Sequence, residues 1–180
     1  MRSRLEGAPS YDIAFLNLAW QSLDAVGALC NESYQMKLLL SLQQCISSMA
    51  KSHMEAYVSH LDIENVLVFM EHPELLQLID PCNIVSQLLL AHMVAVQLSL
   101  RPIFCRERKQ YTVTMFSIRM TRWIDKICSN IGLGYEEFLT WPLLVSKLHH
   151  TKTLEQHVLA SPATSTGVIG GPVGSLVATR

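Results

Sequence analysis

The chain has 180 residues, of which 49% are hydrophobic and 16% are charged, and its formal net charge at pH 7 is −1. This length fits a single domain with a tail and is large enough to bury a hydrophobic core. Because charged residues make up about 25% of a typical soluble domain, their shortage predicts that a partner or a second copy covers part of the apolar surface.

The cysteines and the N-terminus argue against several classes of protein. The first residues are basic but no apolar segment follows them, which argues against a secretory signal. The five cysteines are expected to be reduced and mostly buried. They include no C-x-x-C pair and no close Cys/His pair, so they indicate neither a zinc site nor a compact disulfide framework: Cys30, Cys45, Cys82, Cys105 and Cys128.

A first helix is predicted over residues 11–30, directly after Ser10. Residues 31–33 then break the pattern. Within the helix, apolar side chains recur at three- and four-residue steps, which is typical of an amphipathic helix with one buried stripe: Ile13, Leu16, Trp20, Leu23, Val26 and Cys30.

A second helix is predicted to run without interruption from Ser33, its cap, to about residue 60. Asp62 is then predicted to open a short helix that ends at the His72–Pro73 step, because a residue before proline is pushed out of the helical region. Pro73 is predicted to start a further turn. The second helix has its own predicted buried stripe: Leu39, Leu42, Ile46, Met49, His53 and Tyr57.

Residues 81–100 contain no formal charge and no glycine. Asp80 and Pro81 form a favourable helix start, and Pro102 is expected to stop the helix. A helix of about 20 residues is about 30 Å long, and this one is apolar on nearly every face, so it is predicted to lie inside the domain. The alternative is a membrane span, for which its polar side chains are unfavourable: Asn83, Ser86, Gln87, His92, Gln97 and Ser99.

Beyond Pro102, residues 106–131 resume helical spacing, and Gly132 is predicted to end the helix in the left-handed conformation. Residues 112–114 are locally strand-like, which is retained as an alternative. Thr140 and Pro142 predict another helix start. No alternating strands joined by Asn-Gly or Asp-Gly turns occur, which favours an all-α fold.

These elements predict an all-α fold with a single helical domain around a long buried central helix and a disordered C-terminal tail. The predicted organisation is a flexible N-terminus at residues 1–9, a helical domain at 10–150 and a flexible low-complexity tail at 151–180. Glycines and prolines concentrate after residue 161, and such a composition buries too little apolar surface to offset the entropy of ordering.

No set of residues carries a recognisable metal site. His53 and His60 share a predicted helix, but their spacing corresponds to about 10.5 Å of rise, too far for both to bind one ion without other ligands. His149 and His150 point in different directions and are interpreted as surface residues. Carboxylate pairs near helix starts are interpreted as caps favoured by the helix dipole: Glu71 with Glu74, and Glu136 with Glu137.

Cys105 is the nearest candidate for a nucleophile, because Arg101, Arg106 and Arg108 surround it and could lower the pKa of its thiol. Nothing completes a catalytic set around it. The internal methionines are expected to fill the core, with an adaptable binding groove as the alternative. We therefore assign no catalytic, cofactor-binding or metal-ligating residue and expect no cofactor.

Charge is unevenly distributed along the chain. Residues 1–100 carry 4 Lys+Arg against 10 Asp+Glu, and residues 101–126 carry 7 against 2, which gives −6 and +5. The basic segment has no recognisable DNA-reading helix. It is interpreted as pairing with the acidic first hundred residues or with a protein partner: Arg101, Arg106, Arg108, Lys109, Arg119, Arg122 and Lys126.

One segment supports a resemblance to a known family. Residues 71–103 read EHPELLQLIDPCNIVSQLLLAHMVAVQLSLRPI, and a basic linker at 106–109, a helix around Trp123 and a Y-x-x-x-x-x-WP element at 135–142 follow. This order resembles the late part of the C-terminal regulatory region of fungal binuclear zinc-cluster transcription regulators, especially those beside secondary-metabolite genes. The resemblance covers residues 70–150.

The chain departs from that family because it lacks the six closely paired cysteines through which such regulators read DNA. DNA binding is therefore not carried over, and no functional residue of the family maps onto a position here. The resemblance implies a regulatory region standing alone, a shortened gene product, or a partner that dimerises with a complete regulator. It also implies a nuclear location, where the expectation would otherwise be cytoplasmic.

The leading hypothesis is a non-enzymatic regulatory or protein-interaction domain related to these regulators. We expect a protein partner or self-association, no direct DNA binding by this chain alone, and no membrane. The alternative is a small helical enzyme or ligand-binding protein of a secondary-metabolite pathway, with a Met- and Trp-lined cavity near His92. A third hypothesis is a membrane-associated protein that uses residues 81–100.

Overall fold

The computed structural model describes residues 11–108, 115–132 and 134–160, except the side chains of 106–108 and 152–160. No strand occurs in these residues, and the predicted all-α class is confirmed. The predicted flexible N-terminus, the strand-like residues 112–114 and the tail beyond 160 lie outside the described residues. The described elements are α2 (Ile13–Gly27), α3 (Ser33–Lys51), α4 (His53–Val68), α5 (His72–Ile79), α6 (Ile84–Arg108), α7 (Met115–Ile131), the 3-10 helix η1 (Glu136–Leu139) and α8 (Thr140–Ala160).

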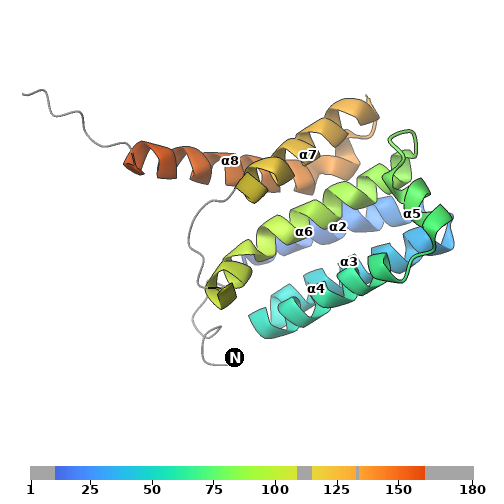
Figure 1. Cartoon of the computed structure of the whole chain (residues 1–180), viewed down its shortest axis with the longest axis horizontal. Coiled ribbons are helices and arrows are strands. Elements are labelled where there is room, and N and C mark those ends of the chain that lie inside the picture. The colour runs from blue at the N-terminus through green and yellow to red at the C-terminus, as the bar shows by residue number, and fades with distance from the viewer. Residues whose placement is uncertain (1–10, 109–114, 133, 161–180) are drawn as a thin grey trace, which may run out of the picture.

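The helices form a central pair with two further helices on each side (Figure 1). The central pair is α2 and α6. Helices α3 and α4 pack together on one side, and α7 and α8 pack together on the other. The short α5 leads into α6, and η1 lies against α2 and α8.

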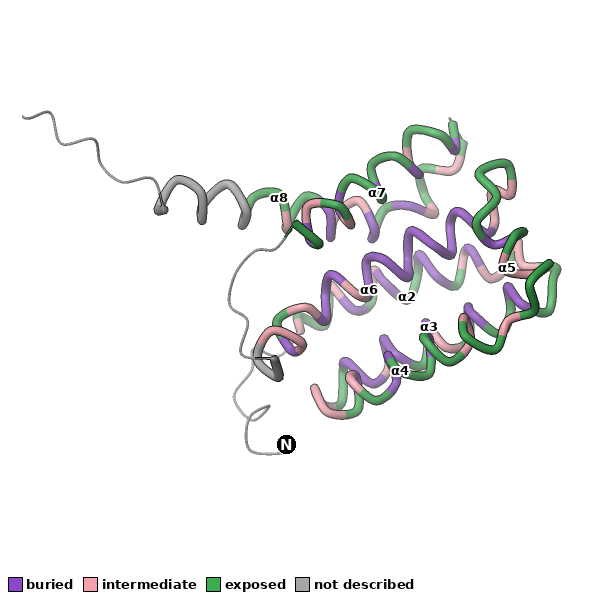
Figure 2. The backbone as a smooth tube through the Cα atoms, viewed as in Figure 1, coloured by how far each residue is buried: buried purple, intermediate pink, exposed green. Residues whose placement is uncertain are grey.

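Helix α6 is buried through its middle turns, as predicted, and less so at its ends (Figure 2). Every residue from 86 to 96 is buried. Among the described helices, α6 is long and apolar enough to cross a membrane by length and composition, yet 72% of its most apolar window is buried inside the protein. This burial favours a core helix over a membrane span.

Helix α6 begins at Ile84, so the prediction of a start at Asp80 and Pro81 is wrong. The Asp80 carboxylate accepts a hydrogen bond from the Cys82 backbone N–H at 2.9 Å. The backbone carbonyl of Asp80 accepts a second hydrogen bond from the Asn83 N–H at 3.1 Å. These bonds close a turn. Asn83 caps α6 instead, because its Oδ1 accepts from the Ser86 N–H at 3.1 Å.

The predicted stop at Pro102 is also wrong, because α6 continues through this proline to Arg108. Pro102 cannot donate to the Leu98 carbonyl. The neighbouring Ser99 carbonyl accepts the hydroxyl of Tyr11 at 2.8 Å. Ile103 is 1% exposed, so packing against the core offsets the missing hydrogen bond.

Replacing Pro102 by alanine is expected to raise the free energy of unfolding by about 1 kcal/mol. Alanine restores the N–H that can bond to Leu98, and this gain is partly offset by the greater freedom of the unfolded chain. Pro73, exposed in the first turn of α5, is the matched control, since its missing N–H needs no helical partner. Urea unfolding of both variants checks this; an equal change in both would contradict it.

The predicted single helix over residues 33–60 is divided at Ser52, and the predicted helix start at Asp62 lies inside α4. Ser52 has extended backbone angles, and its Oγ accepts from the Glu55 N–H at 3.1 Å, which caps α4. The chain thus reverses without glycine or proline. Across the two helices, Ser48 and Ser59 share a buried hydrogen bond of 2.7 Å.

The predicted buried stripes are correct at most positions and wrong at others, including positions in the middle of a helix. In α2, Ile13 is 74% exposed and Trp20 is 37% exposed, while Ala19 and Ser22 are buried. In α7, Trp123 is exposed as well. In both helices, the face with the smaller side chains points toward the core. The predicted stripe residues that are buried are Leu16, Leu23, Val26, Leu39, Leu42, Ile46 and Met49.

The predicted helix end at the His72–Pro73 step is wrong, because α4 already ends at Val68 and His72 is the first residue of α5. Several other predicted helix boundaries are confirmed. Pro73 lies in the first turn of α5, α8 begins at Thr140, and Gly132 ends α7 with φ +80°. Helix α3 begins at Ser33, but Glu32 is its cap. Helix α8 continues to Ala160, past the predicted end of the helical domain at residue 150.

Candidate functional site

A buried polar contact joins α2 to α6 at the centre of the bundle. His92 on α6 is fully buried, and its Nε2 is 2.8 Å from Oγ of Ser22 on α2. Nδ1 of His92 is 2.8 Å from the Leu88 carbonyl oxygen. The hydroxyl of Ser22 is also 2.8 Å from the carbonyl oxygen of Phe138 in η1. The contact therefore connects three elements of the fold.

These three contacts require three hydrogens, whereas a neutral histidine and a serine supply two. The Leu88 carbonyl can only accept, so Nδ1 carries the ring hydrogen and Nε2 is an acceptor. The Ser22 hydroxyl then donates either to Nε2 or to Phe138. Protonation of His92 would satisfy all three contacts, but burial opposes the charge and lowers the pKa of His92 to about 4, against the opposite effect of the hydrogen bond to Leu88.

Trp141 of α8 covers this contact. Its side chain is fully buried, and its ring stacks at 6.0 Å from the ring of His92 and meets Phe15 of α2 edge-on at 5.7 Å. The indole Nε1 finds no hydrogen-bond partner among the described residues, which carries a desolvation cost. Trp141 therefore packs α8 against both central helices.

The Ser22–His92 pair is not arranged for nucleophilic catalysis. A nucleophile must reach its substrate, and Ser22 and His92 are 4% and 0% exposed. The group that orients the imidazole is the Leu88 carbonyl and not a carboxylate. We interpret the pair as a contact between helices.

A second serine and histidine meet at Asp125 of α7. Ser146 of α8 donates to Oδ1 of Asp125 at 2.9 Å, and Nε2 of His150 is 3.2 Å from its Oδ2. The carboxylate lies between the other two groups, so His150 does not activate the serine hydroxyl. This cluster joins α7 to α8. His150 is exposed, as predicted, and His149 is half-buried.

The two histidines considered for a metal pack as aromatic rings. The ring of His60 lies 4.8 Å from that of Phe104, and its Nδ1 is 3.8 Å from the Glu64 carboxylate. His53 lies 5.9 Å from the ring of Tyr11. In the described part of the chain, no group of three His, Cys, Asp or Glu residues could hold a metal ion.

The other candidates from the sequence are dispersed. Cys105 is half-buried near the end of α6, and the side chains of Arg106 and Arg108 lie outside the described residues. Cys45 is buried and Cys82 is exposed, so the expectation of mostly buried thiols holds only in part. The capping interpretation is confirmed at α5, where Glu71 and Glu74 form a capping box.

The cations of α7 do not pair with the described carboxylates of the acidic half of the chain. They make no ion pair with any described side chain and are exposed on one side of α7: Arg119, Arg122 and Lys126. The guanidinium of Arg101 lies 5.8 Å from the ring centre of Phe116, which permits a cation–π contact. Of the two predicted uses of these charges, pairing within the described part of the chain is therefore absent for these three.

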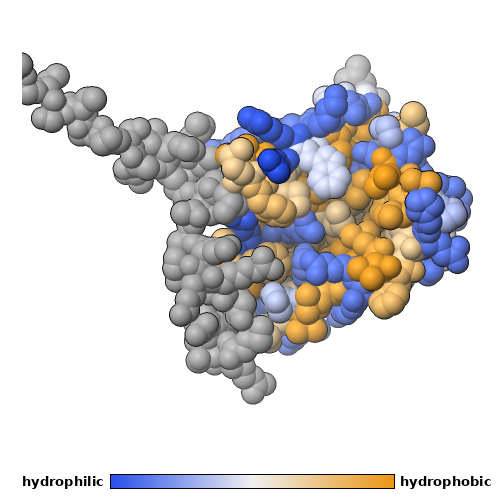
Figure 3. Space-filling model, viewed as in Figure 1, coloured by the Kyte–Doolittle hydropathy of each residue, from blue (hydrophilic) through white to orange (hydrophobic). Residues whose placement is uncertain are grey.

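Large apolar side chains are exposed on α4 and α7, on a surface that we call the α4/α7 face. Figure 3 shows apolar surface over α7 and over the end of the bundle formed by α4 and α5, next to hydrophilic side chains. Phe69, directly after α4, is 83% exposed. A monomer rarely leaves such side chains together in solvent without a use. The apolar members are Val58, Leu61, Val68, Phe69, Met115, Phe116 and Trp123.

Methionine contributes to both the core and the surface. Met49 and Met93 are each 5% exposed, which agrees with core packing. Met36 and Met115 are exposed. Core filling is therefore confirmed for two of these residues, and the alternative of an adaptable binding groove stays a prediction.

Ser22, Asp125 and Ser146 are not among the candidate residues expected from the sequence. A signal existed for Ser22, because it lies three residues after Ala19 and four before Val26, on the buried side of α2. Nothing local marks Asp125, because its partners on α8 come from a separate helix.

The geometry thus defines an all-α bundle with a closed polar centre and an exposed apolar face. No protein-family model, curated protein or solved structure that we compared with this chain matches it.

Proposed function

We propose that this chain is a non-enzymatic protein-interaction domain with a regulatory role. The observation that carries the proposal is the α4/α7 face, where apolar side chains such as Val68 and Phe69 are 74% and 83% exposed. Exposed apolar surface of this kind is typical of protein-binding sites. The serine and histidine side chains that could carry chemistry are meanwhile used in contacts between helices.

The sequence resemblance supplies the proposed context. A regulatory region of the zinc-cluster type, without its own DNA-binding module, would act in the nucleus on transcription by binding other proteins. This assignment rests on the order of elements over residues 70–150.

The alternative of a ligand site near His92 has less support. Both ring nitrogens of His92 already have partners, at Leu88 and Ser22. A ligand would have to displace Ser22 or move Trp141, which stacks on the ring. Burial of α6 inside the bundle likewise gives the membrane hypothesis little support.

A reporter assay tests the proposed function. The full chain is fused to an unrelated DNA-binding domain, and reporter output is compared for the wild type and the variant Val68→Ser/Phe69→Ser. If the face binds a regulatory partner, this variant should change output at least about tenfold toward the value of the unfused DNA-binding domain. It removes two central apolar contacts, each of which costs more than about 1 kcal/mol when truncated.

The control is Ile13→Ser/Leu40→Ser, which alters similarly exposed side chains on α2 and α3. This variant should keep wild-type output. Equal output from the wild-type fusion and the unfused DNA-binding domain would overturn the regulatory role. Equal effects of the two variants would overturn the assignment to the α4/α7 face.

A further inference from the structure

The two helices of the α4/α7 face carry opposite charge. Helix α4 has three carboxylates and no lysine or arginine, and all three carboxylates belong to exposed residues: Glu55, Asp62 and Glu64. Helix α7 has three exposed cations against the single carboxylate of Asp125, which is occupied by Ser146 and His150. Each helix thus combines apolar side chains with charge of one sign.

The two helices also match in length and in the spacing of their charges. Helix α4 has 16 residues and α7 has 17, so each is about 24–26 Å long. Glu55 and Asp62 are seven residues apart, as are Arg119 and Lys126, and seven residues correspond to two helical turns, or about 10.5 Å. Opposed side by side, the helices would bring two carboxylates to two cations.

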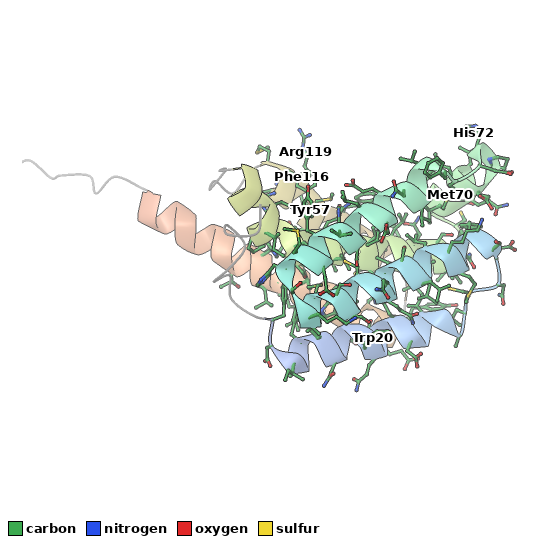
Figure 4. All side chains as sticks on the ribbon, turned by 90° about the horizontal axis from the view of Figure 1, so that it is seen from below. Trp20, Tyr57, Met70, His72, Phe116 and Arg119 are labelled. Carbon is green, nitrogen blue, oxygen red and sulfur yellow. The ribbon has the colours of Figure 1, made fainter. Side chains whose placement is uncertain are left out.

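Both helices are accessible from the same side of the molecule. In Figure 4, Arg119 and Phe116 of α7 lie toward the same edge as His72, the first residue of α5, whereas Trp20 of α2 lies toward the opposite edge. In Figure 1, α7 and α4 lie on opposite sides of α6. The face therefore has a basic half over α7 and an acidic half over α4.

We propose that the occupant of this face is a second copy of the chain. The proposal rests on the proposed function and names its partner. A twofold axis that lies in the face and runs along the helices would place α7 of one copy over α4 of the other, and α4 of the first over α7 of the second. Both contacts unite opposite charges, and the interface closes as a symmetric dimer.

Charge also excludes the competing arrangement. A twofold axis in the face but perpendicular to the helices would oppose α7 to α7 and α4 to α4, which places like charges together. Apolar residues such as Phe69, Phe116 and Trp123 would supply the buried part of the interface, and the charges would select its orientation. Salt should therefore weaken the dimer.

Charge reversal tests the dimer on the full chain by sedimentation velocity over a range of concentrations. One variant is Glu55→Lys/Asp62→Lys, and the other is Arg119→Glu/Lys126→Glu. Each alone opposes like charges at both contacts, so each should raise the dissociation constant at least tenfold. A 1:1 mixture of the two variants, and the variant with all four substitutions, should both dimerise like the wild type.

The controls separate this proposal from loss of folding and from the proposed function. All four positions are exposed, and far-UV circular dichroism should show unchanged helix content. A wild type that stays monomeric at 100-fold the working concentration, or variants that are not restored by mixing, would overturn the dimer. If reporter output still depended on Phe69 in that case, the proposed function would stand, and another protein would be the occupant of the face.

Discussion

Replacement of Trp141 by alanine is expected to lower the free energy of unfolding by about 3–5 kcal/mol, the usual cost of removing a large buried aromatic side chain. Trp141 is fully buried and touches both central helices through His92 and Phe15. Alanine would leave a cavity where α8 meets α2 and α6. Urea unfolding followed by circular dichroism measures the loss.

Two further variants separate the volume of Trp141 from its polar group. Trp141→Phe keeps most of the ring and removes the indole N–H that lacks a partner, so it should cost clearly less than alanine, about 1–2 kcal/mol. Trp20→Ala, at a tryptophan that is 37% exposed, should also cost less. A loss at Trp141→Ala no larger than at Trp20→Ala would contradict this account.

Acid is expected to destabilise the fold through His92. Burial lowers its pKa to about 4 in the folded state, below about 6.5 in the unfolded chain. The neutral ring is therefore favoured by folding, and its contribution is fully present above about pH 6.5. It is lost as the pH falls toward 4, and the total loss is about 3 kcal/mol.

The variant His92→Gln tests this pH dependence. Glutamine does not titrate, so the fall in unfolding free energy between pH 6.5 and 4 should shrink by about 3 kcal/mol, whatever the variant costs at pH 7. His60 is a second contributor in the same direction, because burial lowers its pKa against the opposing charge of Glu64. An unchanged pH slope in His92→Gln would show that another group is responsible for the acid effect.

If the α4/α7 face forms a dimer, dimerisation contributes to the measured free energy of unfolding. A dimer adds free energy that depends on protein concentration, so the variants at Trp141 and His92 should be compared at one fixed concentration. The charge-reversed variants provide the monomer reference for both experiments.

Local capping chemistry could be read from the sequence. Pro73 and Thr140 begin helices, and Gly132 ends one with φ +80°, because each residue acts on backbone groups within one turn of itself. The division at Ser52 was missed. Its hydroxyl caps α4, and Glu55 three residues later gives the Ser-x-x-Glu spacing of a capping box. The apolar stripe that continues across residues 49–57 concealed this signal.

The consequences of Pro102 and of the exposed tryptophans required the tertiary structure. A proline ends a helix unless packing beyond it offsets the lost hydrogen bond, and here Ile103 is buried by other elements. Trp20 and Trp123 follow apolar periodicity, yet their helices turn smaller residues toward the core. The spacing of apolar side chains defines an apolar stripe on a helix, and the neighbouring helices determine which residues of that stripe are buried.

The sequence by itself indicated that the chain is all-α and that the apolar segment ending near residue 100 lies at its centre, because helical periodicity and an uncharged surface favour burial. Its burial inside the bundle, which the tertiary structure shows, then favoured a core helix over a membrane span. Only the tertiary structure decided that Ser22, His92 and Trp141 meet, and that an acidic helix and a basic helix share one exposed face. These residues come from separate helices, and their approach depends on packing over the whole bundle rather than on any local pattern.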